Sequence, residues 1–254
     1  MKVPGFHVLI PARMASSRLP GKPLMEIGGR PMILHVAARA RDSGARSVHV
    51  ATDHEAIREA CEEAGVGVVM TGSGHRSGSE RLAEACEVLS LGGSDIVVNV
   101  QGDEPLMPAR VIRQVAELLE QTPDVEMASL YHPLEEIRDV FAPNVVKVVC
   151  DARGRALYFS RAPVPWDRAA FPDPDGQGAP ARHFRHIGVY AYRAQFLRRY
   201  VALPPAPEET LEALEQLRAL YHGATIVMAE AEAHPGPGVD TEADLERVRG
   251  MLGS

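Results

Sequence analysis

The chain has 254 residues, of which 45% are hydrophobic and 24% charged, so it can bury a core and keep a polar surface. Its formal net charge of -7 is unlike that of a general nucleic-acid binder, which is usually basic. The 3 cysteines are widely spaced, and no apolar run approaches the length of a membrane span. We therefore expect a reduced, cytoplasmic protein without nucleic-acid or membrane partners.

Short apolar runs alternate with amphipathic segments through the first half of the chain. Strands are predicted at 7–10, 48–51, 67–70 and 96–100, and helices between them at about 31–43, 55–64 and 79–89. This alternation is typical of a parallel sheet with helices on both faces. Because ligands bind such sheets at the carboxyl ends of the strands, the loops after Ile10, Ala51, Met70 and Val100 are the candidate sites.

The second half of the chain is richer in predicted strands. These lie at 145–150, 155–160, 186–192 and 225–229, with helices at 208–221 and 242–251 and a Pro- and Gly-rich loop at 162–181. Thr241 is placed to cap the last helix. The sequence thus predicts one α/β domain. About 1–130 and 224–254 would form a mostly parallel, nucleotide-binding (Rossmann-like) sheet. About 131–223 would form a β-rich insert for a second substrate and an oligomer surface.

Three cations follow the first strand directly. Arg13, Arg18 and Lys22 lie within the segment 11–23, among small residues that let backbone N–H groups approach an anion closely. The spacing matches neither the Walker phosphate loop nor the Gly-x-Gly-x-x-Gly dinucleotide motif. A solvated basic turn is the alternative interpretation, but the position after a first strand favours a triphosphate site.

Carboxylates occur in two short Gly-containing turns. Asp103 lies in Gln101-Gly-Asp-Glu-Pro105, directly after the fourth predicted strand, and Asp240 lies far along the chain in Gly238-Val-Asp-Thr241. Magnesium is usually held by one or two carboxylates together with substrate phosphates, so these two aspartates are candidate ligands. Helix capping is the alternative role for Asp240.

These segments carry a family resemblance. The loop 11–23 closely resembles the opening motif of the cytidylyltransferases that use 3-deoxy-D-manno-octulosonate (Kdo), and shares a looser pattern with sialic-acid cytidylyltransferases and other sugar nucleotidyltransferases. Segments 101–105, 238–241 and 76–81 also look like motifs of the Kdo family, with Ser79 where that family has Thr. The similarity extends from about Val8 to Arg249. It implies a nucleotide-diphospho-sugar transferase type of fold.

The resemblance also implies a reaction and its partners. CMP would pass from CTP to Kdo with Mg2+ as cofactor, in a homodimer, and the product would serve lipopolysaccharide biosynthesis. By this similarity the CTP-binding residues are Arg13, Arg18, Lys22, Arg76, Ser77 and Gln101, and the catalytic residues are Arg13, Lys22 and Asp103. The metal ligands are Asp103 and Asp240, with Glu104 as a structural neighbour. The Kdo-binding residues are Gln101, Arg161, His186, Tyr190, Glu215 and Gln216.

The sugar-binding assignments have chemical sense and simpler alternatives. An acid sugar needs Arg or His for its carboxylate and Glu, Gln or Tyr for its hydroxyls. His186 and Tyr190 fall at even spacing on one strand face and would also be explained by packing alone. Glu215 and Gln216 would also fit a solvated helix face. Two other functions stay open: a cytidylyltransferase for 8-amino-Kdo or a sialic acid, and a nucleotide-binding regulatory module without turnover.

Overall fold

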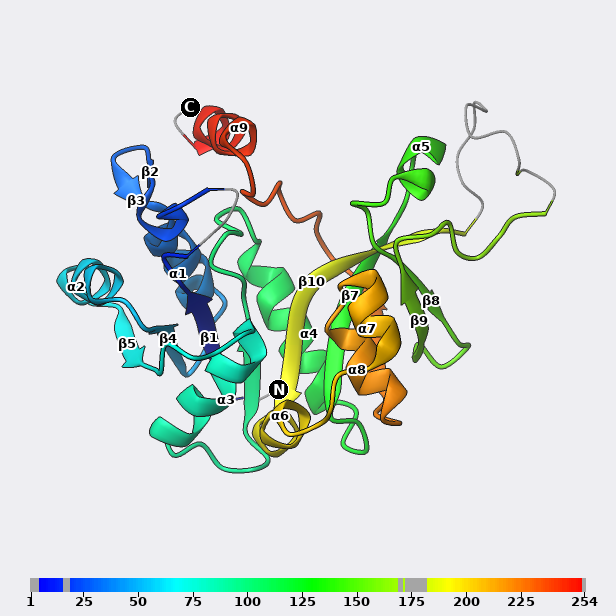
Figure 1. The fold of residues 1–254 in the computed structure, drawn as a ribbon, viewed down its shortest axis with the longest axis horizontal. Coiled ribbons are helices and arrows are strands. Elements are labelled where there is room, and N and C mark those ends of the chain that lie inside the picture. Colours follow the sequence, from blue (N-terminus) through cyan, green and yellow to red (C-terminus); the bar gives the residue numbers. More distant parts are fainter. Residues whose placement is uncertain (1–4, 16–18, 169–170, 172–181, 253–254) are drawn as a thin grey trace.

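The computed structural model describes residues 5–15, 19–168, 171 and 182–252. In this part of the chain a nine-stranded sheet forms the centre of the molecule (Figure 1), with the strand order β11-β7-β10-β6-β1-β4-β5 and with β8 and β9 attached at one side. The strands are β1 (Phe6–Ala12), β4 (Ser47–Thr52), β5 (Gly67–Met70), β6 (Ile96–Asn99), β7 (Met127–Pro133), β8 (Lys147–Cys150), β9 (Ala156–Ser160), β10 (Phe184–Arg193) and β11 (Ile226–Glu230).

Most of the long strands run parallel. β1 pairs in parallel with β4 and β6, β4 with β5, and β7 with β11, whereas β10 is antiparallel to both of its main neighbours, β6 and β7. β1 and β6 run in the same direction, with Leu9 of β1 opposite Asn99 at the end of β6. The loops that follow them, which carry the cations and the first carboxylate turn, therefore leave the sheet at the same edge.

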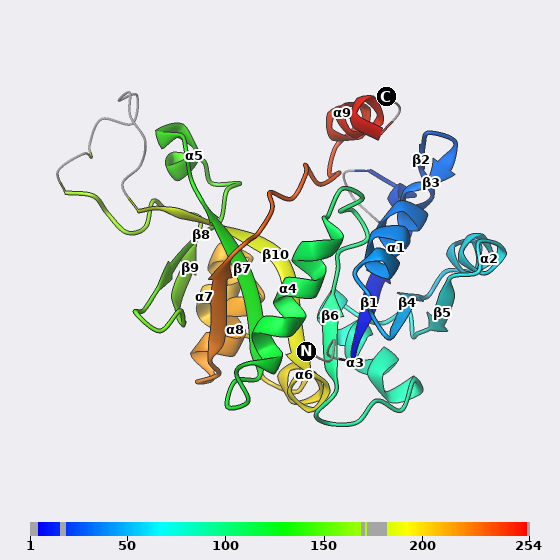
Figure 2. The same cartoon turned by 180° about the vertical axis from the view of Figure 1, so that it is seen from behind.

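Helices cover both faces of the sheet, as predicted. Val8 and Ile10 of β1 pack in one buried cluster with α1 (Met32–Asp42), α2 (Glu55–Glu63) and α4 (Ala109–Glu120). Leu9 faces the other way, into a second cluster with α3 (Gly78–Val88), α6 (Ala194–Val201) and α8 (Gln216–Tyr221). The two layers are seen from opposite sides in Figures 1 and 2. Alternate side chains of one strand thus bury against different helices, as the period of two requires.

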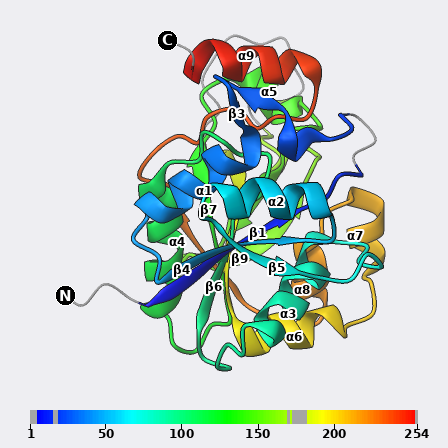
Figure 3. The same cartoon turned by 90° about the vertical axis from the view of Figure 1, so that its left-hand side faces the viewer.

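The C-terminal helix returns to the beginning of the chain. α9 (Glu242–Leu252) packs at one end of the molecule beside the small hairpin of β2 (Glu26–Ile27) and β3 (Arg30–Pro31), as Figure 3 shows. Ile27 and Leu245 are buried in their shared cluster. The amide of Asp244 donates to Thr241 Oγ1 at 3.3 Å, which confirms the predicted cap. This docking holds the turn 238–241 beside the first loop.

The structure differs from the sequence prediction in several elements. The predicted helix 208–221 is two short helices, α7 (Pro207–Glu212) and α8, because Ala213 between them adopts a left-handed conformation with φ of 50°. The helices α4 and α6 and the strand β7 were not predicted, although all three contribute buried residues to the main sheet layers. β10 falls inside the predicted insert 131–223, yet it pairs with β6 and β7 in the main sheet.

The remaining elements are a 3-10 turn, a short helix and a β-hairpin. The 3-10 turn η1 (Lys22–Leu24) follows the first loop, and α5 (Ile137–Phe141) precedes the β8–β9 hairpin. That hairpin confirms the predicted turn, in which Asp151 Oδ1 accepts from the amides of Arg153 and Arg155 at 2.8 Å each. Among the described residues, the helices are too short or too polar to cross a membrane.

Candidate active site

The ammonium group of Lys22 joins three distant parts of the sequence. Its Nζ donates to Asp103 Oδ2 at 2.7 Å, to Asp240 Oδ1 at 3.2 Å and to the carbonyl oxygen of Val239 at 2.8 Å. The lysine side chain is 13% exposed, whereas those of Asp103 and Asp240 are 33% and 48% exposed. The two predicted metal ligands therefore converge on one cation position that remains open to solvent on one side.

Backbone contacts fix the two carboxylate turns against each other. The amide of Val239 donates to the carbonyl oxygen of Asp103 at 2.9 Å. A Cβ at Gly238 would lie 2.9 Å from Glu104 Oε1, and one at Gly102 would lie 2.9 Å from the carbonyl oxygen of Pro11. Both glycines are thus needed for close approach rather than for a special φ value. Burial raises the pKa of Glu104 to about 8, with the charge of Asp103 as the second cause.

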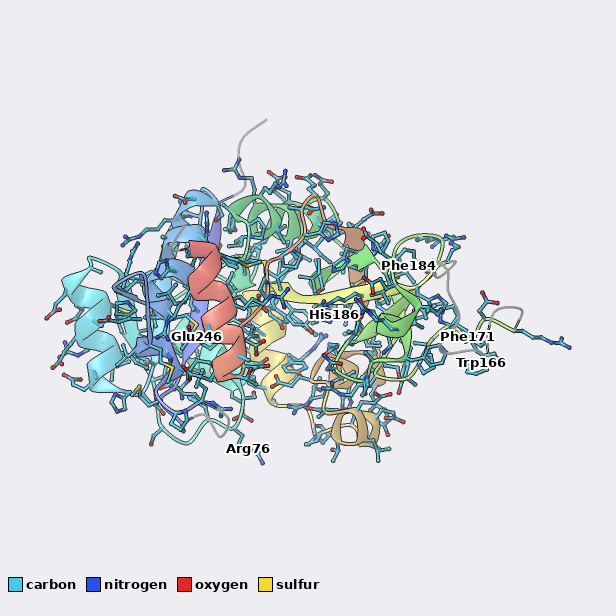
Figure 4. All side chains as sticks on the ribbon, turned by 90° about the horizontal axis from the view of Figure 1, so that it is seen from above. Arg76, Trp166, Phe171, Phe184, His186 and Glu246 are labelled. Carbon is cyan, nitrogen blue, oxygen red and sulfur yellow. The ribbon has the colours of Figure 1, made fainter. Side chains whose placement is uncertain are left out.

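The first cavity opens at this cluster and has a volume of about 320 Å³. Lys22, Asp103 and Asp240 line it together with Arg13, which is exposed, and Arg76, whose side chain is 86% exposed. Figure 4 shows Arg76 at the periphery of the molecule and His186 well inside it. Arg18 lies outside the described residues. The cavity thus combines the exposed cations Arg13 and Arg76 and the partly buried Lys22 with two carboxylates, a charge pattern that suits a metal–polyphosphate complex.

The N-terminus of α3 forms another wall of this cavity. Ser77 is the N-cap, since its Oγ accepts from the amide of Glu80 at 3.2 Å. The Glu80 carboxylate accepts from the amide of Arg76 at 2.7 Å. Arg81 is buried in the same helix and donates to Asp53 at 3.0 Å and to Thr71 at 2.5 Å. Arg81 thereby fixes the helix start to the loops that follow β4 and β5.

A second cavity of about 270 Å³ adjoins the first. It is lined by His186, Tyr190 and Gln216 among others, and it shares Gln101 and Glu215 with the first cavity. The rings of His186 and Tyr190 lie 5.3 Å apart between centroids, so the two residues do share a strand face. Five of the predicted Kdo-binding residues are therefore brought together here. The predicted nucleotide and sugar sites meet at Gln101 and Glu215.

Burial keeps the imidazole and phenol groups of His186 and Tyr190 in the second cavity neutral. Desolvation lowers the pKa of His186 to about 3, with the charge of Arg185 as a smaller cause. The ring nitrogen Nε2 of His186 is 2.9 Å from Ser129 Oγ, which also bonds to backbone carbonyl oxygens. Burial likewise raises the pKa of Tyr190 well above its ordinary value. At neutral pH this cavity therefore offers uncharged imidazole and phenol groups, which suit sugar hydroxyls.

Arg161 is the predicted sugar-binding residue that the structure places elsewhere. Its guanidinium donates to the carbonyl oxygens of Glu212 at 2.6 Å, Pro143 at 2.9 Å and Ala213 at 3.4 Å. It lines neither of these two cavities. In this structure Arg161 ties the end of β9 to the turn between α7 and α8, and its role in binding stays a prediction.

Some lining residues were not assigned from the sequence. His75 and Arg81 line the first cavity, and Asn99, Tyr192 and Tyr200 line the second. Asn99 is the polar last residue of the buried strand β6, which is a signal that the sequence offers. Its Oδ1 is buried without a hydrogen-bond partner among the described residues. Tyr192 and Tyr200 lie at positions in the sequence that are typical of core aromatic residues, so the pattern did not indicate that they line a cavity.

The residues present fit a magnesium ion. Carboxylate oxygens are the donors that Mg2+ prefers, and two of them are already drawn to one cation, the Lys22 ammonium. No group of three or more His, Cys, Asp or Glu side chains with metal-site geometry occurs in the described ranges. A binding mode with two carboxylates and substrate phosphates matches that donor count.

Comparisons with known proteins give one consistent family. The cytidylyltransferase family model matches residues 7–226. The 3-deoxy-manno-octulosonate cytidylyltransferase of Idiomarina loihiensis is 54% identical over 249 residues, with 98% of each chain covered. The protein of the same name from an Acidovorax species is 55% identical over 255 residues, covering 98% of this chain and 97% of its own.

Solved structures agree with the sequence relatives. A CMP:2-keto-3-deoxy-manno-octonic acid synthetase complexed with CTP superposes with a TM-score of 0.89 at 40% identity, with 98% of each chain covered. A Leptospira borgpetersenii cytidylyltransferase has a TM-score of 0.63 at 18% identity, covering 98% of this chain and 87% of that one, which shows a shared fold. By these matches, and with its cation and carboxylate turns gathered at one edge of the sheet, the chain belongs to the 3-deoxy-manno-octulosonate cytidylyltransferase family.

Proposed function

We propose that this enzyme transfers CMP from CTP to the anomeric hydroxyl of Kdo, giving CMP-Kdo and pyrophosphate. The observation that carries the proposal is the pair of adjoining cavities. One is lined by cations and two carboxylates, the other by neutral imidazole, phenol and amide groups, and they meet at Gln101 and Glu215. Membership of the family supplies the reaction class, and the curated relatives supply the sugar.

The chemistry required of the protein is mainly positioning. The anomeric oxygen forms a bond to the α-phosphorus of CTP, the bond from that phosphorus to the pyrophosphate oxygen breaks, and the hydroxyl proton passes to solvent. Both substrates are anions, so repulsion between them must be overcome. Arg13 and Lys22 line the first cavity and attract phosphate oxygens, while Gln101 lies where the two substrates would meet.

Mg2+ belongs to the proposal as the cofactor, with Asp103 and Asp240 as its protein ligands. When bound, it would neutralise charge on the phosphate oxygens and so favour attack on the α-phosphorus. Lys22 contacts both carboxylates and lines the same cavity. It would therefore hold the two carboxylates in place and also attract the phosphates.

A homodimer and a cytoplasmic location complete the proposal. Large apolar side chains stay exposed in the β-rich part, namely Leu157, Trp166 and Leu211 at 59%, 58% and 85%. Covering them in a second copy would remove apolar area from water. Light scattering should give twice the 27.5 kDa of one chain, and a value of 27.5 kDa would contradict the dimer.

The three free cysteines suit a reducing compartment, which cell fractionation would check.

The assay that tests the function measures pyrophosphate release with CTP, Mg2+ and a panel of acid sugars. We expect release with Kdo and little with 8-amino-Kdo or N-acetylneuraminate. Release with one of the other sugars in place of Kdo would keep the reaction class and move the error to the second cavity. CTP binding without release for any sugar would instead favour a regulatory module.

The metal role of Asp103 predicts a selective loss of turnover. Asp103→Asn keeps the size of the side chain but removes the charge that contacts Lys22, and kcat should fall by a factor of roughly 100 or more. Asp95→Asn is the matched control, since Asp95 precedes the same strand β6 and its carboxylate accepts a local bond from the Gly92 amide at 2.7 Å. The thermal midpoints of both variants report folding. Near-normal kcat in folded Asp103→Asn would remove Asp103 from the metal site.

A further inference from the structure

One hydrogen bond connects the walls of the two cavities directly. Ser79 Oγ donates to Glu215 Oε2 at 2.9 Å, across 136 residues of sequence. Ser79 is 5% exposed in the first turn of α3, beside the N-cap Ser77. Glu215 lies immediately before α8, in the segment predicted to contact the sugar. Ser79 lines the second cavity and Glu215 lines both, so this bond lies at the junction of the two cavities.

Glu215 is held to the same layer by its main chain. The hydroxyl of Tyr200, on α6, donates to the carbonyl oxygen of Glu215 at 2.7 Å. Tyr200 is 3% exposed, and α6 packs against α3. Both anchors of Glu215 therefore come from the α3–α6 layer, so the position of its carboxylate is set by the helix that carries Ser77 and Ser79.

The other charged groups around Glu215 are engaged elsewhere. Arg218 donates to both carboxylate oxygens of Glu209, at 2.6 and 2.8 Å, so it neutralises Glu209 first. Within the described residues, Ser79 is the one side chain that donates a hydrogen bond to the Glu215 carboxylate. Desolvation raises the pKa of Glu215, as do the charges of Glu209 and Glu80, while the Ser79 bond and Arg218 oppose that shift.

Glu215 also lines more than one cavity. It lines the first and second cavities and a third of about 420 Å³, which opens between the start of α3 and the α7–α8 turn. A carboxylate has about four acceptor positions, and Ser79 uses one, so the others can accept hydroxyls of a bound sugar. The value of this arrangement depends on the carboxylate being ionised and correctly turned.

We propose that Ser79 is a positioning residue that holds the Glu215 carboxylate in the orientation and charge state needed to bind the sugar. It acts through Glu215, and it lines the second cavity but not the first, where Lys22, Asp103 and Asp240 lie. The inference rests on the proposed function, because Glu215 has a sugar to bind only if that function holds. The role belongs to the hydroxyl alone, so Thr, which carries the same donor, should replace Ser.

Steady-state kinetics of three variants test this role. Ser79→Ala should raise the KM for Kdo about tenfold, the scale of one charge-assisted hydrogen bond, and leave the KM for CTP within about twofold. The acid limb of kcat/KM for Kdo should move to higher pH, because losing the donor raises the pKa of Glu215 further. Ser79→Thr should restore both values.

Ser47→Ala is the matched control. Its Oγ also bonds to a side chain, His7 Nδ1 at 2.8 Å, but at the opposite ends of β1 and β4. Ser77 keeps the N-cap of α3, so Ser79→Ala should retain the thermal midpoint of the wild type.

The outcomes separate the two claims. An unchanged KM for Kdo and an unchanged acid limb in Ser79→Ala, with an active wild type, would overturn the positioning role alone. Equal rises in both KM values with a lower thermal midpoint would also overturn it, because they indicate a purely structural bond. A wild type without turnover on Kdo would refute the proposed function and this inference together.

Discussion

The contact of one ammonium with two carboxylates organises the site. Lys22 Nζ reaches Asp103 and Asp240, which lie 81 and 218 residues away along the chain. A different part of the fold places each of these two carboxylates beside Lys22. Asp103 follows the central strand β6, and Asp240 precedes the helix α9 that docks beside the β2–β3 hairpin. A carboxylate pair in such proximity repels itself unless a cation lies between, so the lysine makes the pair tolerable before any substrate arrives.

The site has two electrostatic regimes, and burial separates them. Around Lys22 the charged groups remain partly open to solvent, which lets them exchange partners when an anionic nucleotide enters. Around His186 the protein excludes water, and the lowered pKa of that ring keeps it uncharged through the neutral range. Charge thus attracts phosphates at one end, while neutral imidazole and phenol groups and the Glu215 carboxylate face the sugar hydroxyls at the other. Gln101 and Glu215 belong to both regions, which is why the chemistry has to occur between them.

Sequence patterns predicted most of this architecture where the pattern was local. The parallel strands of the first half, the helices α1 to α3 and the cap at Thr241 follow from periodicity and capping rules. The break at Ala213 could not be predicted, because a left-handed alanine is fixed by the contacts around it rather than by propensity. The convergence of Asp103 and Asp240 came from family resemblance, since no spacing rule brings such distant residues together. The hydrogen bonds of Arg161 to backbone carbonyl oxygens could not be predicted, because the carbonyl groups come from segments far from Arg161 in the sequence.

We propose that Asp103 and Asp240 form one cation site that Lys22 and a divalent metal share. The most direct test is a crystal structure of the enzyme with CTP and Mn2+, located by its anomalous scattering. We expect one Mn2+ peak within bonding distance of both carboxylates and of the CTP phosphates. Lys22 Nζ should then no longer contact at least one of the two carboxylates. A Mn2+ ion held by the phosphates alone, with Lys22 still bridging Asp103 and Asp240, would contradict it.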